Sequence, residues 1–258
     1  MAVIAVINSK GGAGKSTVVS HLAAYRAMRG PDIALCDLDP QKSTEFWLRQ
    51  RPVNSPKIRG HSLANSFTHL PTDARHVFID TPSNFQGLAY LRVMMYADAV
   101  LVPTAFSFFD RRALESTVRM LQAAPRVVKG NCVIACVGTR IDPRSNDHAL
   151  LETMLRNLGV AYLGAIPSAR IYSRCLEHGL TVFDFPSELA RRQIAHWAGV
   201  IAWLETVCAK ATSHPVHPCV SASRPVVAPD VPTRRPVPVP RPSFAAALLR
   251  SIPRFLVR

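Results

Sequence analysis

The chain has 258 residues, 48% of them hydrophobic, which is enough to bury a sizeable core in one large or two small domains. Its 31 basic and 17 acidic residues give a net charge of +14, which predicts a polyanionic partner, either nucleic acid or an acidic membrane surface. The N-terminus carries no basic leader, and no apolar run approaches the roughly 20 residues that cross a bilayer, so neither a secretory signal nor a spanning helix is expected. The six cysteines form no Cys-x-x-Cys pair, which favours buried thiols in a reducing cytosol over a disulfide or zinc framework.

The charge and the prolines are unevenly distributed along the chain. Residues 1–208 and residues 209–258 each carry a net charge of +7, and the second segment holds ten of the 21 prolines. Composition of this kind favours an extended, unfolded segment. The sequence therefore predicts a folded domain over residues 1–208 and a flexible, disordered tail over residues 209–258.

Short β-branched runs alternate with longer helical patterns along the first 208 residues. Strands are expected at 3–7, 33–36, 77–79, 99–102, 133–137 and 162–166, and helices at 15–28, 43–51, 86–96, 111–124, 147–158 and 187–208. Asp110 and Ser187 are expected N-caps, and Gly30 and Gly159 are expected helix ends. Residues 52–75 show no clear period. Because the strand runs are continuously apolar, they indicate an α/β fold with a doubly wound, mostly parallel sheet and helices on both faces.

The first expected strand leads directly into a glycine-rich loop, Asn-Ser-Lys-Gly-Gly-Ala-Gly-Lys-Ser-Thr at residues 8–17, and then into a helix. In this context small residues let backbone N–H groups converge on phosphate oxygens at a helix N-terminus. Lys15 would reach the terminal phosphates and Ser16 would supply a hydroxyl to Mg²⁺. An ordinary glycine-rich turn is the competing interpretation, and the Gly-Lys-Ser sequence at this junction argues against it.

The loop departs from the standard phosphate-loop pattern, because Ser9 replaces its first glycine and a second lysine, Lys10, follows. The run Lys-Gly-Gly-Ala-Gly-Lys-Ser resembles the deviant Walker A box of the ParA/MinD family of P-loop ATPases, and the chain is most similar to small ParA partition proteins of the ParF kind. The resemblance implies ATP and Mg²⁺ as cofactors and a homodimer that sandwiches the nucleotides. It also implies that Lys10 reaches across to the partner's phosphates, as an arginine finger does. The phosphate contacts would come from Lys10, Gly11, Gly12, Ala13, Gly14, Lys15, Ser16 and Thr17.

Two further motifs follow in the family's order. Cys-Asp-Leu-Asp-Pro-Gln at residues 36–41 ends the second strand, where Asp37 and Asp39 point the same way and ligands of α/β sheets bind. By the resemblance, Asp37 helps hold the metal through water and Asp39 orients the attacking water; a capping turn before the next helix is a compatible alternative. His-Val-Phe-Ile-Asp-Thr-Pro at residues 76–82 resembles a Walker B strand, in which Asp80 supports Mg²⁺ through a water.

Other positions are assigned by a looser resemblance that extends over about residues 1–205. Thr139, Arg140 and Pro167 would border the adenine. Basic residues near the C-terminal helices, Arg170, Arg174, Arg191 and Arg192, are candidates for sequence-independent DNA binding, although each alone could lie on a solvated helix face. Residues 243–258 could form a short basic amphipathic segment that binds DNA, a protein groove or an anionic membrane, with Pro253 weakening the membrane interpretation.

The combined expectation is a cytoplasmic, nucleoid-associated ATPase that dimerises on Mg-ATP, binds DNA non-specifically and positions a plasmid, chromosome or other cargo. Its hydrolysis would be slow and stimulated by an adaptor of the ParB kind. The alternative is a MinD-like regulator that its C-terminal segment attaches to a membrane. Metabolic P-loop chemistry ranks lower, because the sequence shows no iron–sulfur cysteine set and no extra substrate domain.

Overall fold

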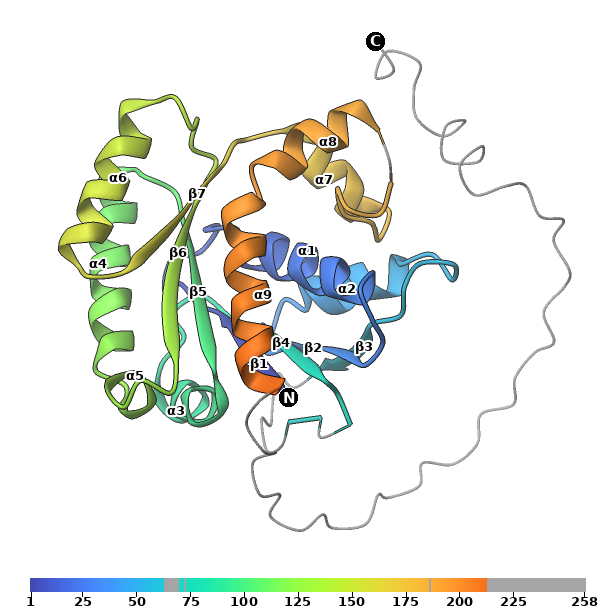
Figure 1. Cartoon of the computed structure of the whole chain (residues 1–258), viewed down its shortest axis with the longest axis horizontal. Coiled ribbons are helices and arrows are strands. Elements are labelled where there is room, and N and C mark those ends of the chain that lie inside the picture. Colours follow the sequence, from blue (N-terminus) through green and yellow to red (C-terminus); the bar gives the residue numbers. More distant parts are fainter. Residues whose placement is uncertain (63–69, 72, 186, 213–258) are drawn as a thin grey trace, which may run out of the picture. The chain divides into compact units, whose positions relative to one another are not determined.

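A computed structural model describes residues 1–62, 70–71, 73–185 and 187–212, in which strands and helices alternate (Figure 1). The strands are β1 (Ala2–Val6), β2 (Ile33–Asp37), β3 (Arg59–Ser62), β4 (His76–Asp80), β5 (Ala99–Thr104), β6 (Val133–Thr139) and β7 (Ala161–Ile166). The helices are α1 (Lys15–Ala27), α2 (Ser43–Gln50), α3 (Gly87–Tyr96), α4 (Phe108–Gln122), α5 (Pro125–Val128), α6 (Asn146–Asn157), α7 (Arg170–Glu177), α8 (Glu188–Ala195) and α9 (Ala198–Thr212). The domain boundary expected after residue 208 falls inside α9, and the rest of the expected tail lies outside the described residues, so that division stays a prediction.

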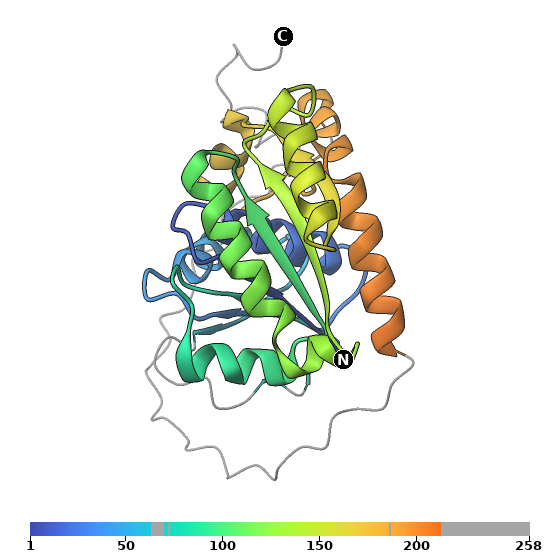
Figure 2. The same ribbon diagram turned by 90° about the vertical axis from the view of Figure 1, so that its left-hand side faces the viewer.

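The strands form one parallel sheet in the order β3-β2-β4-β1-β5-β6-β7. The chain runs from β1 through β2 to β3 in one direction and from β4 through β5 to β7 in the other. Because parallel crossovers are right-handed, the two halves place their helices on opposite faces. Helices α1, α2 and α9 cover one face, and α3 to α6 cover the other, which Figure 2 turns towards the viewer. The predicted doubly wound fold is confirmed, and every strand pair is parallel.

Burial on both faces explains why the strands read as continuous apolar runs. In β1, Val3 and Ala5 join one hydrophobic cluster with Val93 of α3, Leu114 of α4 and Leu151 of α6, and all five side chains are fully buried. The intervening residues of β1 are also buried, on the face that α1 and α9 cover. Each fully buried valine or leucine side chain contributes about 1.5–3 kcal/mol.

The single helix expected over residues 187–208 is wrong, because α8 and α9 are separate. Between them Trp197 is buried and stacks on His21 of α1, with 4.9 Å between the ring centroids. Its indole N–H donates to the hydroxyl of Tyr172 in α7 over 3.2 Å. A Cβ on Gly199 would lie 2.3 Å from a β7 carbonyl oxygen, so glycine lets α9 approach the sheet closely. Tertiary packing thus overrides a continuous helical pattern.

Other differences lie at short or edge elements. Strand β3 was not predicted, because its sequence Arg-Gly-His-Ser has no apolar run, and the short helices α5 and α7 were missed. Helix α4 begins three residues early: Ser107 is its N-cap, and Asp110, the expected cap, is the third helical residue. Ser187 is the N-cap of α8, as predicted, and Gly159 follows α6 at a φ of +67°.

The cysteines of the described ranges behave as the sequence predicts. Cys36, Cys132, Cys136, Cys175 and Cys208 are buried free thiols, and burial raises the pKa of each above its ordinary value. Cys219 lies outside the described residues. Within those residues, none of the helices combines the length and the hydropathy needed to span a bilayer.

Candidate nucleotide-binding site

Three neighbouring strands bring the sequence motifs to one edge of the sheet. Val6, the last residue of β1, pairs in register with Asp80 of β4, and Asp80 pairs with Asp37 of β2. The Thr81 hydroxyl donates to the Val6 carbonyl over 2.7 Å and joins the ends of β4 and β1. The glycine-rich loop leaves β1 at this level, where the winding direction of the chain reverses and α/β sheets bind ligands.

The loop needs glycine at two of its positions. Gly12 and Gly14 have φ values of +72° and +91°, which lie in the left-handed region that favours glycine. Thr139 at the end of β6 packs against the loop: its hydroxyl donates to the Ala13 carbonyl over 2.9 Å, and its methyl group would lie 3.4 Å from a Cβ on Gly14. Thr139 was expected beside the adenine, which stays a prediction; its contact with the loop backbone was not anticipated.

Contacts with two other elements, β5 and α4, hold the start of the loop. The buried Asn8 amide donates to the Pro103 carbonyl over 2.7 Å, and its oxygen accepts from the Lys10 backbone N–H over 2.9 Å. The Ser9 hydroxyl lies 3.0 Å from the hydroxyl of Thr117 in α4. Ser9, the residue that departs from the standard phosphate-loop pattern, therefore anchors the loop to α4.

The two lysines of the loop differ in surroundings. Lys15 is buried, and its ammonium donates to the Lys10 carbonyl over 3.3 Å. Burial lowers its pKa, against the opposing charges of Asp80 and Asp39. Lys10 is partly exposed, and its ammonium forms an ion pair with Asp110 in the first turn of α4. From the sequence, Asp110 was expected only as a helix N-cap; the serine-to-aspartate capping pattern at residues 107–110 is the sequence signal that would have placed this carboxylate.

Asp80 is a buried carboxylate at the end of β4. Its side chain is fully inaccessible, and within the described residues neither oxygen has a hydrogen bond of normal geometry. Burial raises its pKa to about 7; Asp37 and Asp39 add to this effect, while the nearby Ser16 hydroxyl and Lys15 oppose it. Because Mg²⁺ prefers carboxylate and hydroxyl oxygens, Asp80 and Ser16 fit the metal that the resemblance implies.

The carboxylates of Asp37 and Asp39 differ in the hydrogen bonds that they accept. Asp37 caps α2: one carboxylate oxygen accepts from the Asp39 N–H, and the other accepts from the N–H and hydroxyl of Thr44 and from the Glu45 N–H, at 2.7–3.0 Å. The capping interpretation of this motif thus holds, and the metal role of Asp37 stays a prediction. Asp39 is half-buried; one oxygen accepts from the Gln41 N–H over 2.9 Å. Its role towards water also stays a prediction.

The positions assigned to the adenine lie at the ends of β6 and β7. Arg140 has a φ of +58° and an exposed side chain, and its N–H donates to the Ile166 carbonyl over 2.7 Å. Pro167 follows β7 and is half-buried. Arg140 and Pro167 thus share one strand-end region.

The four arginines assigned to DNA come from two helices in contact, since the Tyr172 hydroxyl of α7 donates to the Gln193 amide oxygen of α8 over 3.2 Å. Arg170, Arg191 and Arg192 are exposed, and Arg174 is half-buried. Glu188 accepts from both neighbouring arginines of α8, at 2.9 Å from Arg191 and 3.4 Å from Arg192. The positive charge of that pair is therefore partly neutralised.

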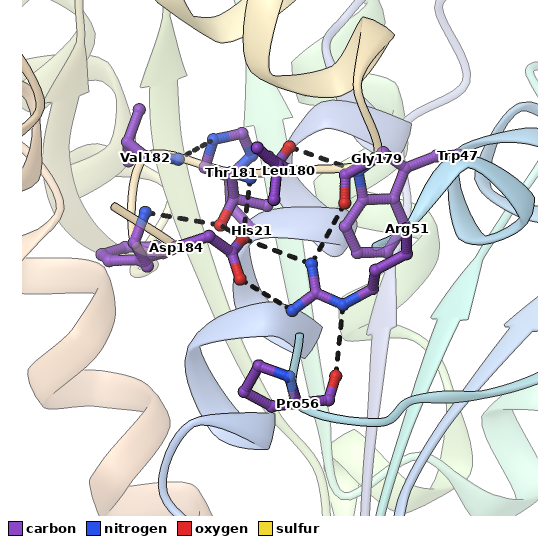
Figure 3. Close-up of polar contacts among 10 residues, drawn as sticks. His21, Trp47, Arg51, Pro56, Gly179, Leu180, Thr181, Val182 and Asp184 are labelled. Atoms are coloured by element: carbon purple, nitrogen blue, oxygen red, sulfur yellow. Dashed lines mark hydrogen bonds and ion pairs between the residues drawn. The ribbon is translucent and has the colours of Figure 1, made fainter. Parts of the chain in front are cut away.

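A buried ion pair connects the end of α2 to the segment between α7 and α8 (Figure 3). The guanidinium of Arg51 lies against the Asp184 carboxylate at 2.8 Å, and these side chains are only 6% and 3% exposed. Arg51 also donates to the carbonyls of Gly179 and Pro56, both over 3.2 Å. Asp184 accepts from the N–H and hydroxyl of Thr181. This network fixes the chain that leads into α8, and sequence reasoning missed it.

Comparisons with known proteins agree with this geometry. A family model described as the CobQ/CobB/MinD/ParA nucleotide binding domain matches residues 4–182. The chain is 29% identical over 212 residues to the maintenance of carboxysome distribution protein A of Gloeobacter kilaueensis, covering 79% of this chain and 94% of the relative.

Two solved structures share the fold. A putative plasmid partition protein from Borrelia burgdorferi bound to AMPPNP has a TM-score of 0.61 at 16% identity, over 78% of this chain and 99% of its own. Cobyrinic acid a,c-diamide synthase from Mycobacterium smegmatis, with an ATP analogue and magnesium, has a TM-score of 0.54 at 19% identity, over 69% and 93%. The chain belongs to the CobQ/CobB/MinD/ParA family, as a ParA/MinD-type ATPase related to partition and carboxysome-positioning proteins.

Proposed function

We propose that this protein hydrolyses ATP with Mg²⁺, dimerises around two nucleotides and, as a dimer, binds DNA without sequence preference to position a cargo. The observation that carries the proposal is the phosphate loop with a buried lysine, Lys15, and a second, partly exposed lysine, Lys10. A single phosphate site needs only the buried lysine. The partly exposed one, which is paired with Asp110 in its own subunit, would exchange that partner for the phosphates of a second subunit.

Residues at the three strand ends would share the chemistry. Backbone N–H groups of residues 11–17 and the Lys15 ammonium would hold the phosphates, and Asp80 with Ser16 would hold Mg²⁺. Bound Mg²⁺ would supply neutralisation of charge on the phosphate oxygens. Asp39, with one oxygen not used in a hydrogen bond to a described residue, would orient the attacking water.

Nucleotide-dependent dimerisation would make DNA binding switchable. The arginines of α7 and α8 would be doubled in the dimer, and two weak phosphate-binding surfaces acting together bind DNA far more tightly than one. Hydrolysis, stimulated by a ParB-like adaptor, would separate the subunits and release the DNA. The protein would then be cytoplasmic and associated with the nucleoid, which a fluorescent fusion would test.

The deciding experiment compares DNA binding of the full chain with ATP and with ADP, for the wild type and Lys10→Ala. We expect a salt-sensitive complex with ATP only, and its loss in the variant. If Lys10→Ala leaves dimerisation and DNA binding intact, the proposal is wrong. The MinD-like alternative depends on residues 243–258, which lie outside the described residues; liposome sedimentation with and without them would test it.

A further inference from the structure

The partly exposed lysine of the phosphate loop is held by its own subunit. The Lys10 ammonium forms an ion pair with one carboxylate oxygen of Asp110, and the two side chains are 36% and 8% exposed. These residues are 100 positions apart in the sequence and meet because β1 and β5 are neighbours in the sheet.

Asp110 is fixed in place by the first turn of α4. Its second carboxylate oxygen accepts from the Ser107 N–H over 2.9 Å, and its own N–H donates to the Ser107 hydroxyl over 3.2 Å, which makes a capping box. Although burial raises it, hydrogen bonds from Lys10 and Ser107 lower the pKa of Asp110 below its ordinary value. A charged, immobile carboxylate therefore faces Lys10.

The ion pair lies at an accessible turn. Phe108 and Phe109, beside Asp110, are 59% and 72% exposed and contact each other edge to face. Another molecule that approached this edge of the sheet would meet the same turn of α4.

On the basis of the proposed function, we propose that Asp110 is an intramolecular latch that holds Lys10 within its own subunit until a second, nucleotide-loaded subunit takes its place. A triphosphate offers several charged oxygens to an ammonium group, whereas Asp110 offers one. Exchange of partners is thus favourable only when a second subunit presents its phosphates. Asp110 would be a positioning residue that raises the threshold for dimerisation.

The test uses the full chain with two variants that separate the charge of Asp110 from its cap. Asp110→Asn removes the charge but keeps an oxygen that can accept from the Ser107 N–H. Ser107→Ala removes the hydroxyl of the capping box and keeps the carboxylate. Sedimentation velocity with AMPPNP and Mg²⁺ measures dimerisation, and mass spectrometry after amine acetylation without nucleotide measures the reactivity of Lys10.

We expect Asp110→Asn to dimerise at about 5-fold lower concentration, in the usual range of coupling between sites, and to acetylate faster at Lys10. Ser107→Ala should match the wild type in both. The latch is refuted if folded Asp110→Asn shows unchanged acetylation, or dimerises no better than the wild type. A wild type that stays monomeric with AMPPNP would instead overturn the proposed function, while the acetylation rates would still decide whether Asp110 holds Lys10.

Discussion

Replacing Asp80 by asparagine should stabilise the protein while removing Mg²⁺-dependent hydrolysis. Asp80 is fully buried, neither of its oxygens has a normal hydrogen bond within the described residues, and burial raises its pKa to about 7. A group that binds ligand well is often poorly accommodated without it, so its removal trades function for stability.

The sign and size follow from proton linkage. Between about pH 4 and pH 7 the unfolded chain has lost the proton that folded Asp80 keeps, so stability falls as the pH rises through this window and is level above it. The full difference between the unfolded and folded pKa values of Asp80 corresponds to about 4 kcal/mol of unfolding free energy. An asparagine amide with unpaired groups costs about 1–2 kcal/mol in the same place. We expect a net gain of about 2 kcal/mol at pH 8, or about 4–8 °C in Tm for a domain of this size.

Thermal unfolding followed by circular dichroism, in EDTA and without nucleotide, measures this gain. It should be present at pH 8 and absent at about pH 3, below both pKa values of Asp80, where the carboxyl is protonated in the folded and the unfolded state. Asp37→Asn is the matched control, since Asp37 pairs in register with Asp80 on the neighbouring strand. Its carboxylate accepts four hydrogen bonds at the start of α2, so this substitution should lower stability by about 1–3 kcal/mol.

Two results would refute this reasoning. If Asp80→Asn lowers the Tm at pH 8 as Asp37→Asn does, the Asp80 carboxylate is compensated in the folded protein. If the variant hydrolyses ATP with an unchanged Mg²⁺ requirement, Asp80 does not support the metal.

Three further predictions concern the rest of the domain. Removing one partner of the buried Arg51–Asp184 pair, as Arg51→Met or Asp184→Asn, should destabilise the protein by about 3 kcal/mol in thermal unfolding. The double variant should lose less stability than the sum of the two single losses. Additive losses would mean that the two groups act independently. Gly179→Ala should destabilise the protein by more than about 3 kcal/mol, because Gly179 has a φ of +68° and a Cβ there would lie 2.3 Å from the backbone nitrogen of Arg51. Gly130→Ala is the control: Gly130 has a similar φ but open space around it, so this substitution should cost about 1 kcal/mol. Glu188→Gln removes the carboxylate charge that Arg191 and Arg192 share, so it should tighten ATP-dependent DNA binding measured by fluorescence anisotropy. Alanine at either arginine should reduce the slope of log affinity against log salt concentration by about 1. Equal affinities in all three variants would exclude α8 from the DNA surface.

The sequence predicts the central sheet well, because strands covered on both faces must be apolar throughout. Strand β4 differs from its expected limits by one residue at each end, and β2 by one residue at its end. Edge strand β3 could not be found in this way, since it has a single neighbour and the sequence Arg-Gly-His-Ser. The break at Trp197 depends on the ring of His21, 176 positions earlier in the chain, and no local pattern encodes that contact.

The candidate site likewise has parts that the sequence predicts and parts that it does not. Motifs within one strand and its following loop, such as residues 8–17, can be read directly, and their meeting follows from the parallel register of β1, β2 and β4. The Thr139 bond to the Ala13 carbonyl and the Lys10 ion pair with Asp110 could not be predicted. They join residues 126 and 100 positions apart and depend on the order of β1, β5 and β6.

Four aspartates near the phosphate loop therefore differ through the donors that the fold gives them. Asp37 accepts hydrogen bonds from the start of α2, and Asp110 contacts both its own helix and Lys10. Among the described residues, Asp39 keeps one oxygen that accepts no hydrogen bond, and neither oxygen of Asp80 has a hydrogen bond of normal geometry. The charges of Asp37 and Asp39 make ionisation of Asp80 harder, and the Lys15 ammonium only partly opposes them. A divalent cation beside Ser16 would reverse that balance, so Mg²⁺ with nucleotide should raise the Tm of the wild type more than that of Asp80→Asn.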